Sequence, residues 1–301
     1  MTCDHSWTAT RRGSVCDLCG SKRYHGPRAT IVAPEGRCFL DFDADSLHYR
    51  IAACLSQDPF ILGSLQRYDT TQDALYKPHV QNCSALFTVA PEQAVDWMNG
   101  KQPQYTFAKN FIYMLLNGGD VPALANAAAS AGLTLNHKDV KKLLDKWLER
   151  AIVFKGWREA LVREAEQTGA ITLSDGRRRR FYGARWKKGA SKWSLGRKTL
   201  KEVYNFPLIG TEVSYMNPRI LLVYQLTVSG PLSKWLLVLH EHDGFMLEGC
   251  QEEQWSTYTM LLDKLNSEAW SHMRIDDKRV LYVPFDGKGG TCWAELTKVV
   301  Q

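Results

Sequence analysis

The chain has 301 residues, of which 45% are hydrophobic and 23% are charged, with a formal net charge of +6. This length supports one large or two modest domains with a buried core, and the composition is typical of a globular protein. No run of 18 or more apolar residues occurs, so neither a membrane-spanning helix nor a membrane partner is expected. The first ten residues lack an apolar stretch with a cleavage signal, so we predict no export and a cytoplasmic location.

Residues 1–26 are rich in Cys, Gly and basic side chains and are predicted to form a small separate element. Cys3 and His5, followed by Cys16 and Cys19, have the ligand types and spacing of a four-coordinate Zn²⁺ knuckle. In a chain that is not exported, reduced thiols or a metal site are favoured over disulfides. The remaining cysteines are expected to be buried small apolar residues rather than ligands; they are Cys38, Cys54, Cys83, Cys250 and Cys292.

The next elements are predicted from hydrophobic periodicity. Residues 37–43 are apolar and β-prone and indicate a strand, whereas residues 58–175 are predicted to be mainly helical. Residues 234–248 contain two apolar runs around a polar tip that ends in Asp243-Gly244, which is typical of a β-hairpin. The predicted helices cover residues 46–56, 139–150, 154–166, 202–226 with Pro207 near its start, and 254–267.

Positive charge is concentrated in one predicted loop, residues 176–198. Between Gly176 and Lys201 the chain has eleven Lys or Arg and no Asp or Glu. The segment is either a solvated basic loop or a track for nucleic-acid phosphates, since clustered cations release counterions when they neutralise phosphates. Four aromatic residues are interleaved: Phe181, Tyr182, Trp186 and Trp193.

Two aspartates are placed where a pair of Mg²⁺ ions would need them. Asp43 follows an apolar strand and Asp243 lies at the hairpin tip. Mg²⁺ prefers oxygen ligands and is usually held by one or two protein carboxylates plus substrate phosphates, an arrangement that phosphoryl transfer uses. An Asp at a hairpin tip is also a common turn former, so the position alone leaves both interpretations open.

Lys109, Tyr113 and Asn117 follow one another at intervals of four residues, which places them on one face of a helix. A Lys and a Tyr on such a face can bind a triphosphate and stack on a base. The alternative is a packed helix whose Lys extends its ammonium group to solvent.

The segment 39–59 resembles motif A of the family A DNA polymerases, the bacterial DNA polymerase I type. That motif contains Asp-Tyr-Ser-Gln-Ile-Glu-Leu-Arg and ends in Leu-Ser-x-Asp-Pro. Setting Arg50 on the motif's Arg puts Asp43 on its catalytic Asp, with Asp41 and Asp45 as flanking competitors. Residues 238–244 resemble motif C, whose core is His-Asp-Glu; His242 and Asp243 match, and Gly244 replaces the Glu. The resemblance implies that Asp43, Ala44 and Asp243 hold two Mg²⁺ ions.

The segment 108–118 resembles motif B, the fingers helix of the same family. The resemblance implies that Lys109 contacts the triphosphate and that Tyr113 lies beside the incoming sugar and base. Tyr at that position implies acceptance of dideoxynucleotides. Residues 79–87 are similar to the segment that carries a triphosphate-binding His, which places His79 in that role.

Three positions depart from the family's pattern around the nucleotide. Tyr105 stands where the family has an Arg. His48 and Asn117 stand where the family pairs a Glu with a Tyr to exclude the ribose 2′-hydroxyl. Because both partners change together, we expect ribonucleotides to be rejected less strictly, or by another residue.

Further segments resemble the family's template and primer contacts. Residues 176–182 resemble its Gly-Arg-Arg-Arg-Tyr stretch, and residues 205–211 resemble its Asn-x-Pro-x-Gln-Gly-Thr, with Ile209 in place of the Gln. Residues 8–14 faintly resemble a stretch at the palm entrance whose Arg approaches the minor groove; on that view the N-terminal cysteines are incidental and zinc is not bound. The nucleic-acid-binding residues that the resemblance implies are Arg12, Arg177, Arg178, Arg179, Arg180, Lys201, Asn205 and His242.

The predicted fold is α+β, a polymerase palm with an antiparallel sheet and a helical fingers subdomain, with a possible zinc element at residues 1–26. The palm is assigned to residues 27–57 and 205–301 and the fingers to residues 58–204. The predicted activity is template-directed DNA polymerisation with primer-template DNA, dNTPs and two Mg²⁺ ions, in a bacterium or a phage-infected cell. Zn²⁺ is a further cofactor if the knuckle at residues 1–26 forms.

Two other functions remain open at this point: a primase or RNA-synthesising polymerase, and a catalytically inactive nucleic-acid-binding subunit. Few residues precede the segments that resemble the family. We therefore expect either a second polypeptide that supplies a thumb or exonuclease, or weak and distributive DNA binding by this chain alone.

Overall fold

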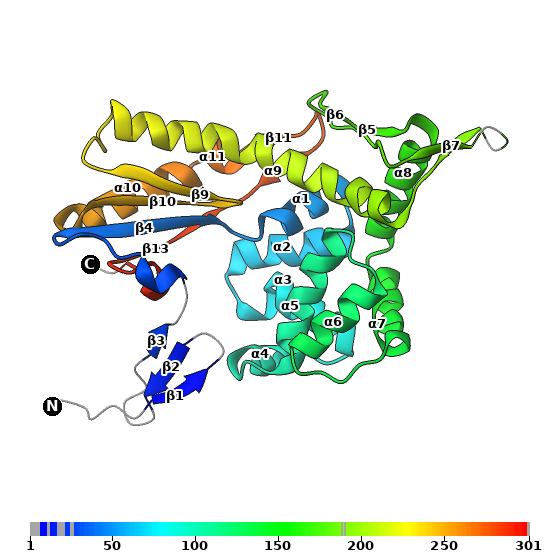
Figure 1. Ribbon diagram of the computed structural model, residues 1–301, viewed down its shortest axis with the longest axis horizontal. Coiled ribbons are helices and arrows are strands. Elements are labelled where there is room, and N and C mark those ends of the chain that lie inside the picture. Colours follow the sequence, from blue (N-terminus) through cyan, green and yellow to red (C-terminus); the bar gives the residue numbers. More distant parts are fainter. Residues whose placement is uncertain are drawn as a thin grey trace. The chain divides into compact units, whose positions relative to one another are not determined.

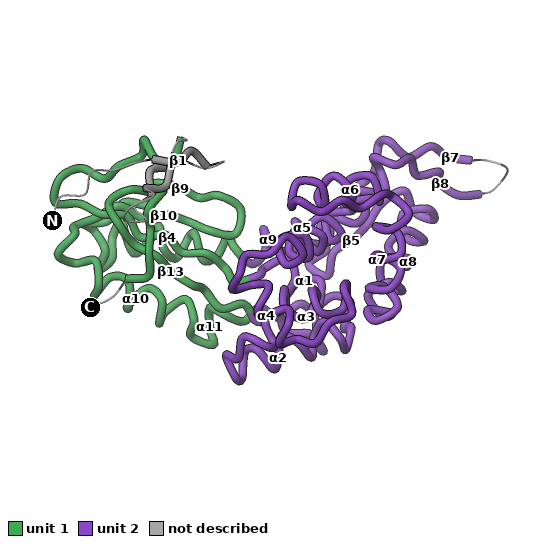
Figure 2. The backbone as a smooth tube through the Cα atoms, turned by 90° about the horizontal axis from the view of Figure 1, so that it is seen from below, with its two compact units in different colours: residues 1–45, 216–272, 283–301 green, residues 46–215, 273–282 purple. Residues whose placement is uncertain are grey.

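A computed structural model of the chain describes residues 7–10, 13–16, 22–24, 27–187, 189 and 191–299 (Figure 1). Before residue 27 only the backbone of three short strands is described: β1 Trp7–Thr10, β2 Gly13–Cys16 and β3 Lys22–Tyr24. The chain divides into two compact units (Figure 2). Unit 1 comprises residues 1–45, 216–272 and 283–301, and unit 2 comprises residues 46–215 and 273–282.

Unit 1 is built on a four-stranded antiparallel sheet in the order β13-β4-β10-β9. The strands are β4 Arg37–Ala44, β9 Leu236–Glu241, β10 Gly244–Cys250 and β13 Phe285–Gly290. The predicted strand at residues 37–43 and the predicted hairpin are both present. The other elements of this unit are η1 Pro27–Thr30, η4 Gln251–Glu253, α10 Gln254–Asn266, α11 Glu268–Ser271 and η5 Trp293–Glu295.

The central strand β4 has two different faces, because successive strand residues point to opposite sides of a sheet. Leu40, Phe42 and Ala44 are fully buried on one face. Phe42 stacks on Tyr258 of α10 at 5.9 Å, so this face packs against that helix. The other face buries Phe39 with Ala33 and Met246, and then presents Asp41 and Asp43.

Unit 2 is mainly helical, as predicted for residues 58–175. Five of its helices have Pro in the first two positions. A backbone N–H at these positions has no acceptor within the helix, so Pro removes no helical hydrogen bond there. Its elements up to residue 168 are α1 Leu47–Ser56, α2 Pro59–Thr71, η2 Ala74–Tyr76, α3 Pro78–Phe87, α4 Pro91–Asn99, α5 Pro103–Leu116, α6 Val121–Ser130, α7 His137–Arg150 and α8 Ile152–Thr168.

One buried carboxylate joins two of these helices. Asp58 is 0% exposed, and its Oδ1 accepts hydrogen bonds from the N–H groups of Phe60 and Ile61 at the start of α2. Its Oδ2 accepts from Val153 and Phe154 at the start of α8. The α8 N-cap residue itself makes no side-chain hydrogen bond, so Asp58 satisfies N–H groups that would otherwise have no partner.

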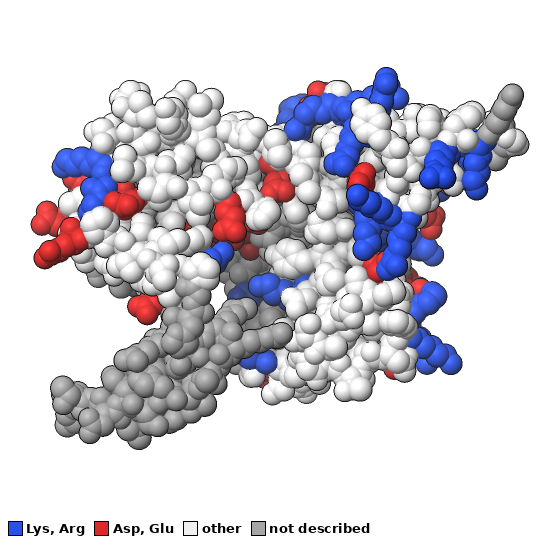
Figure 3. Space-filling model, in the orientation of Figure 1, with Lys and Arg blue, Asp and Glu red and all other residues white. Residues whose placement is uncertain are grey.

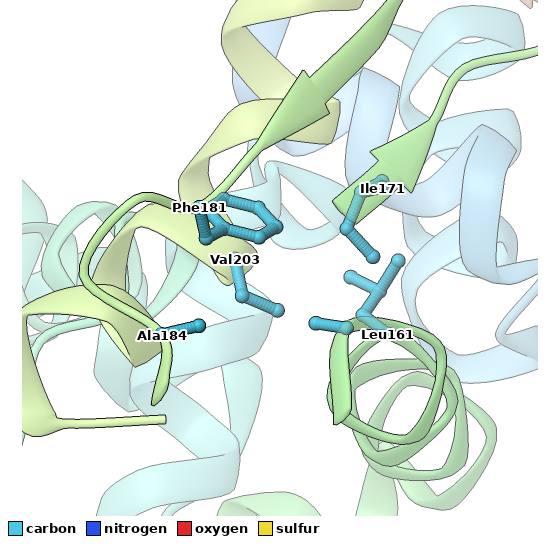
Figure 4. Packing of buried hydrophobic residues seen from close by; sticks show 6 residues of the cluster. Leu161, Ile171, Phe181, Ala184 and Val203 are labelled. Atoms are coloured by element: carbon cyan, nitrogen blue, oxygen red, sulfur yellow. The ribbon is translucent and has the colours of Figure 1, made fainter. Parts of the chain in front are cut away.

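The basic segment is not a plain loop, which corrects the prediction for residues 176–198. It contains three short strands, and β6 pairs with β5 while β7 pairs with β8. A buried hydrophobic cluster lies beneath these strands and is formed by Leu161, Ile171, Phe181 and Val203 (Figure 4). The charge pattern of the segment gives no indication of this core. The strands are β5 Ala170–Thr172, β6 Arg178–Arg180, β7 Arg185–Lys187 and β8 Lys192–Ser194.

A single long helix, α9 Arg197–Val228, follows the basic segment. The predicted start at residue 202, with Pro207 in the first turns, is therefore wrong, because Pro207 lies well inside the helix. Burial of Val203, Leu208 and Tyr215 along the helix compensates for the hydrogen bond that Pro removes. Two further short strands, β11 His272–Arg274 and β12 Val280–Tyr282, pair with each other.

Among the described residues, no helix is both long and apolar enough to cross a membrane. Cys38, Cys54 and Cys83 are buried, as predicted, whereas Cys250 and Cys292 are only partly covered. Burial raises the pKa of the Cys38 and Cys54 thiols to about 11 and that of Cys83 to about 12. These thiols therefore stay protonated, which suits a packing role.

Candidate functional site

A cluster of acidic side chains lies on the open face of the sheet in unit 1. Asp41 and Asp43 are two residues apart on β4 and therefore share a face. In the β4–β10 pairing Asp43 stands opposite Gly244, and in the β4–β13 pairing it stands opposite Asp286. Directly opposed residues of antiparallel strands lie on the same side of the sheet, so the acidic groups gather at one end of this face.

The β9–β10 turn brings Asp243 to the same end of the sheet. Its two turn residues are His242 and Asp243, because Glu241 pairs with Gly244. The Ala44 N–H donates a hydrogen bond to the main-chain oxygen of Asp243 at 2.9 Å, which fixes the turn against the end of β4. His242 has φ of 55°, a conformation that costs free energy in a residue other than Gly.

The surroundings of Asp43 raise the pKa of its carboxyl group. Its pKa is raised from 3.8 to about 7, first by loss of surrounding water, then by the charge of Asp243 and then by that of Asp41. Lys288, opposite Asp41 on β13, lowers the pKa of both β4 carboxyls and partly offsets the repulsion. The contribution of Asp243 to this pKa agrees with the main-chain hydrogen bond that fixes Asp243 beside the end of β4.

A cavity of about 330 Å³ opens at this cluster, and all its lining residues belong to unit 1. Arg28 of η1 lies on its wall, with its guanidinium 4.5 Å from the Trp293 ring centre and 3.3 Å from the Glu241 carboxylate. The cavity therefore has both acidic and basic groups around Asp43 and Asp243. A ligand that carries both anionic groups and bound cations would find oppositely charged partners for each among these side chains.

The residues present fit a divalent cation of the Mg²⁺ type. Such an ion takes oxygen ligands and keeps several positions for water and substrate, so two carboxylates suffice. Asp43 and Asp243 supply them, and their mutual repulsion is what a cation would relieve. Within the described part of the chain no group of three or more His, Cys, Asp or Glu is arranged to hold a metal ion, so a closed all-protein site is not present there.

Gly244 occupies a confined position beside the Asp43 carboxyl. A Cβ atom at this position would lie 3.0 Å from the Phe42 carbonyl oxygen and 3.2 Å from Asp43 Oδ1. A larger side chain there would have to displace the Asp43 carboxyl. The glycine thus keeps β10 and the β4 carboxylate close together.

In unit 2, the predicted nucleotide-binding residues gather on α3 and α5. Lys109 is exposed and lies one turn before Tyr113 on the same helix face. The His79 ring of α3 lies 5.6 Å from the Tyr113 ring, centre to centre. Tyr105, one turn before Lys109, is partly buried, and burial raises its pKa above the usual value.

The two predicted sugar-gate positions are both engaged by α9. His48 Nε2 lies 2.7 Å from Oε2 of Glu212, a carboxylate that is largely buried. Asn117 accepts a hydrogen bond from Asn205 at 3.0 Å and donates to the Tyr113 carbonyl oxygen at 2.8 Å. Sequence reasoning missed Glu212, because no local pattern connects it with a residue 164 positions away.

The predicted nucleic-acid contacts differ in their surroundings. Arg177 donates to Asp175, to Ser214 and to the Gly210 carbonyl oxygen, so its guanidinium is engaged within the fold. Arg179 lies 3.3 Å from Glu202, and Lys201 lies 3.9 Å from Asp120. Arg178 and Arg180 are exposed. Arg12 and the cysteine cluster lie outside the described side chains: Cys3, His5 and Cys19 are not described, and Cys16 is described only as part of β2.

Sequence reasoning also missed Arg28 and Lys288 beside the carboxylates. The strand register places Lys288 opposite Asp41, and only the folded sheet shows this. Asp286, opposite Asp43, turns its Oδ1 to the Gly287 N–H at 3.0 Å.

No family model and no curated protein sequence matches the chain. Its structure is similar to the POL domain of Pol1 from M. smegmatis, solved in complex with DNA primer-template and dNTP, with a TM-score of 0.66 and 18% sequence identity. The similarity covers 88% of this chain and 42% of that chain, so this chain spans less than half the length of its neighbour. At this identity the likeness establishes the fold: helices with an antiparallel sheet, arranged as in a DNA polymerase domain.

Proposed function

We propose that the chain is a template-directed DNA polymerase of the family A type, which joins dNTPs to a primer 3′-hydroxyl. The observation that supports this most directly is the meeting of Asp43 and Asp243 at one end of the unit 1 sheet, with the Asp43 pKa raised to about 7 by desolvation and by its acidic neighbours. The neighbouring structure binds DNA primer-template and dNTP, which makes these the partners to test first. The palm is proposed to comprise residues 27–57 and 205–301 and the fingers residues 58–204. The two compact units differ from these bounds in that residues 46–57, 205–215 and 273–282 belong to unit 2.

In this proposal Asp43 and Asp243, with the main chain of Ala44, hold Mg²⁺. When bound, Mg²⁺ would lower the pKa of the attacking hydroxyl and offset the charge of the leaving pyrophosphate. Lys288 and Arg28 balance the acidic cluster and shape its cavity. Lys109 and His79 are proposed to steady the triphosphate, and Tyr113 to lie against the base and sugar.

Primer extension tests the proposal. Wild-type protein with Mg²⁺, dNTPs and a primed template is expected to extend the primer, whereas Asp243→Ala and Asp43→Asn are expected to lose at least a thousandfold in rate, since each removes a proposed metal ligand. Asp263→Ala is the matched control, because Asp263 is an exposed aspartate on α10 of the same unit. Absence of extension by the wild type, or equal rates for Asp243→Ala and Asp263→Ala, would refute the proposal and favour a catalytically inactive nucleic-acid-binding subunit.

A second candidate, synthesis with relaxed sugar selection as in a primase or RNA-synthesising polymerase, is favoured by one observation. His48 and Asn117 are held by Glu212 and Asn205, so neither pairs with the other as the family's Glu and Tyr do. Comparison of dNTP and rNTP incorporation tests it. A strong preference for dNTPs that is unchanged in His48→Ala would eliminate this candidate, and primer-independent synthesis from NTPs would establish it.

A further inference from the structure

The strand register divides the acidic face of unit 1 into rows of side chains. In the first row Asp43 stands opposite Gly244, which in turn stands opposite Glu241. In the next row Lys288 stands opposite Asp41. Residues two apart on a strand point to the same face and are separated by about 7 Å. A basic residue therefore stands one row away from the proposed metal ligand Asp43, on the same face of the sheet.

Arg28 brings a second cation to this face from the segment before β4. Its guanidinium lies 4.5 Å from the Trp293 ring centre, and its Nη2 donates to Oε2 of Glu241 at 3.3 Å. The Trp293 N–H donates to the Ile31 carbonyl oxygen at 3.1 Å, which ties the ring to the segment that carries Arg28. A guanidinium has five N–H donors, so the contact with Glu241 leaves most of them available to a ligand.

Lys288 is the less engaged of the two cations. Its side chain is exposed and forms no ion pair with any residue that the structure describes. On the face that Figure 3 shows, Lys and Arg side chains gather mostly over unit 2, whereas acidic and basic side chains are interspersed over unit 1. Arg28 and Lys288 therefore add local positive charge to a mixed surface.

Both cations line the cavity of about 330 Å³ that also contains Asp43 and Asp243. Its lining includes four carboxylates and two Lys or Arg side chains. Two Mg²⁺ ions held by Asp43 and Asp243 would offset the charge of all four carboxylates. The positive charge of Arg28 and Lys288 would then be available to an anionic group of the ligand.

We propose that Arg28 and Lys288 form a phosphate subsite, which binds the last internucleotide phosphate of the primer strand. Naming the primer rests on the proposed function, which places the primer 3′-hydroxyl beside Asp43 and Asp243. The nearest phosphate belongs to the same nucleotide as that hydroxyl, and the length of a nucleotide is comparable with the separation of the two rows. Arg28 supplies a planar fork for phosphate oxygens, and Lys288 supplies a compact ammonium group.

Two other roles for these cations predict different behaviour. If Arg28 and Lys288 only neutralise Glu241 and Asp41, replacing them should strengthen Mg²⁺ binding and leave DNA binding unchanged. Lys288 stands opposite Asp41 but forms no ion pair with it, which argues against this role. If the cations bind the triphosphate of the incoming nucleotide, replacing them should raise the KM for dNTP and leave primer binding unchanged.

Neutralising one primer phosphate tests the inference. A dideoxy-terminated primer cannot be extended, so fluorescence anisotropy can follow the binding of such a primer-template to the full chain with Mg²⁺ and without reaction. A methylphosphonate at the last primer linkage should weaken binding by the wild type about 10-fold, within the range for loss of a charge-assisted contact. Arg28→Gln/Lys288→Gln should bind the unmodified primer about 10-fold more weakly, and the methylphosphonate should then add no more than about twofold.

The controls separate position, charge and folding. A methylphosphonate several linkages further from the 3′ end should affect the wild type and the double variant equally. Lys298→Gln should bind like the wild type, because Lys298 is an exposed lysine of unit 1 that does not line the cavity. Arg28→Lys should keep part of the sensitivity, since it retains the charge without the planar fork. Lys288→Gln alone should reduce the sensitivity with an unchanged circular dichroism spectrum, because its side chain is exposed.

The binding assay needs no reaction, so its outcome does not depend on polymerase activity. Equal sensitivity of the wild type and the double variant to the methylphosphonate at the last linkage would overturn the inference. A higher KM for dNTP with unchanged primer binding would also overturn it. The expected loss of sensitivity, found with a wild type that extends no ordinary primer, would support the phosphate subsite and refute the polymerase proposal. Extension of ordinary primers without that loss would refute the phosphate subsite alone.

Discussion

Replacement of Asp58 by Ala should destabilise unit 2 more than any exposed cap substitution. The change removes four hydrogen bonds, at 2.9 to 3.2 Å, from main-chain N–H groups at the starts of α2 and α8. Loss of two N-caps costs about 2 kcal/mol. Two of the four donors, those of Ile61 and Phe154, are on buried residues, and leaving each without an acceptor adds about 1 kcal/mol. The expected loss of unfolding free energy is therefore about 4 kcal/mol.

Urea denaturation followed by far-ultraviolet circular dichroism measures this loss, and hydrogen exchange localises it to the amides of residues 60–61 and 153–154. Asn136→Ala is the matched control, because Asn136 also caps a helix through two N–H groups but is exposed; about 1 kcal/mol is expected there. Asp58→Asn should fall between the two, since it keeps one acceptor oxygen. A cost for Asp58→Ala no larger than that of Asn136→Ala would refute the idea that one carboxylate supports both helices.

Four further predictions concern other groups. Mg²⁺ should raise the thermal midpoint of the wild type but not of Asp43→Asn, as measured by calorimetry; an equal rise in both would place the ion elsewhere. Gly244→Ala should cost about 1–3 kcal/mol in urea denaturation and slow primer extension, because its Cβ would crowd the Asp43 carboxyl. Arg197 and the Ala123 N–H lower the pKa of Asp120 to about 2, so Asp120→Asn should reduce stability above pH 4, and this difference should vanish as the pH falls through 2. Tyr113→Phe should reduce incorporation of dideoxynucleotides in a chain-termination assay, and unchanged termination would count against the role given to Tyr113.

Local sequence patterns predicted the sheet strand β4, the β9–β10 hairpin and the helices α1, α7, α8 and α10, because each is set by hydrophobic period and turn residues over ten or so positions. They failed where packing overrides local preference. Pro207 indicated a helix start, yet α9 continues through it because its apolar side chains are buried. The charges of residues 176–198 indicated a loop, yet Phe181 is buried in a small hydrophobic cluster beneath short strands.

Long-range partners were beyond sequence reasoning for a different reason. The sequence marked Asp58, His48 and Asp43 through motif similarity, but not what they contact. Glu212 beside His48 and Lys288 opposite Asp41 are fixed by helix packing and strand register across more than 160 residues. No periodicity within either segment specifies such a pairing. The resemblance therefore identified the positions, whereas the residues that they contact could be learned only from the folded chain.

The acidic end of the unit 1 sheet also bears on whether the site serves the fold or a ligand. His242 adopts a positive φ, and Gly244 leaves room for the Asp43 carboxyl. Loss of surrounding water, followed by the charges of Asp243 and Asp41, raises the Asp43 pKa to about 7. Each feature costs stability, and an Asn or Ser at residue 43 would relieve most of the repulsion. Residues that destabilise the fold are expected at sites where the binding of a ligand offsets their cost. A cation bound between Asp43 and Asp243 would replace the repulsion between the two carboxylates by attraction to the ion. The stability of the fold alone gives no reason for this arrangement.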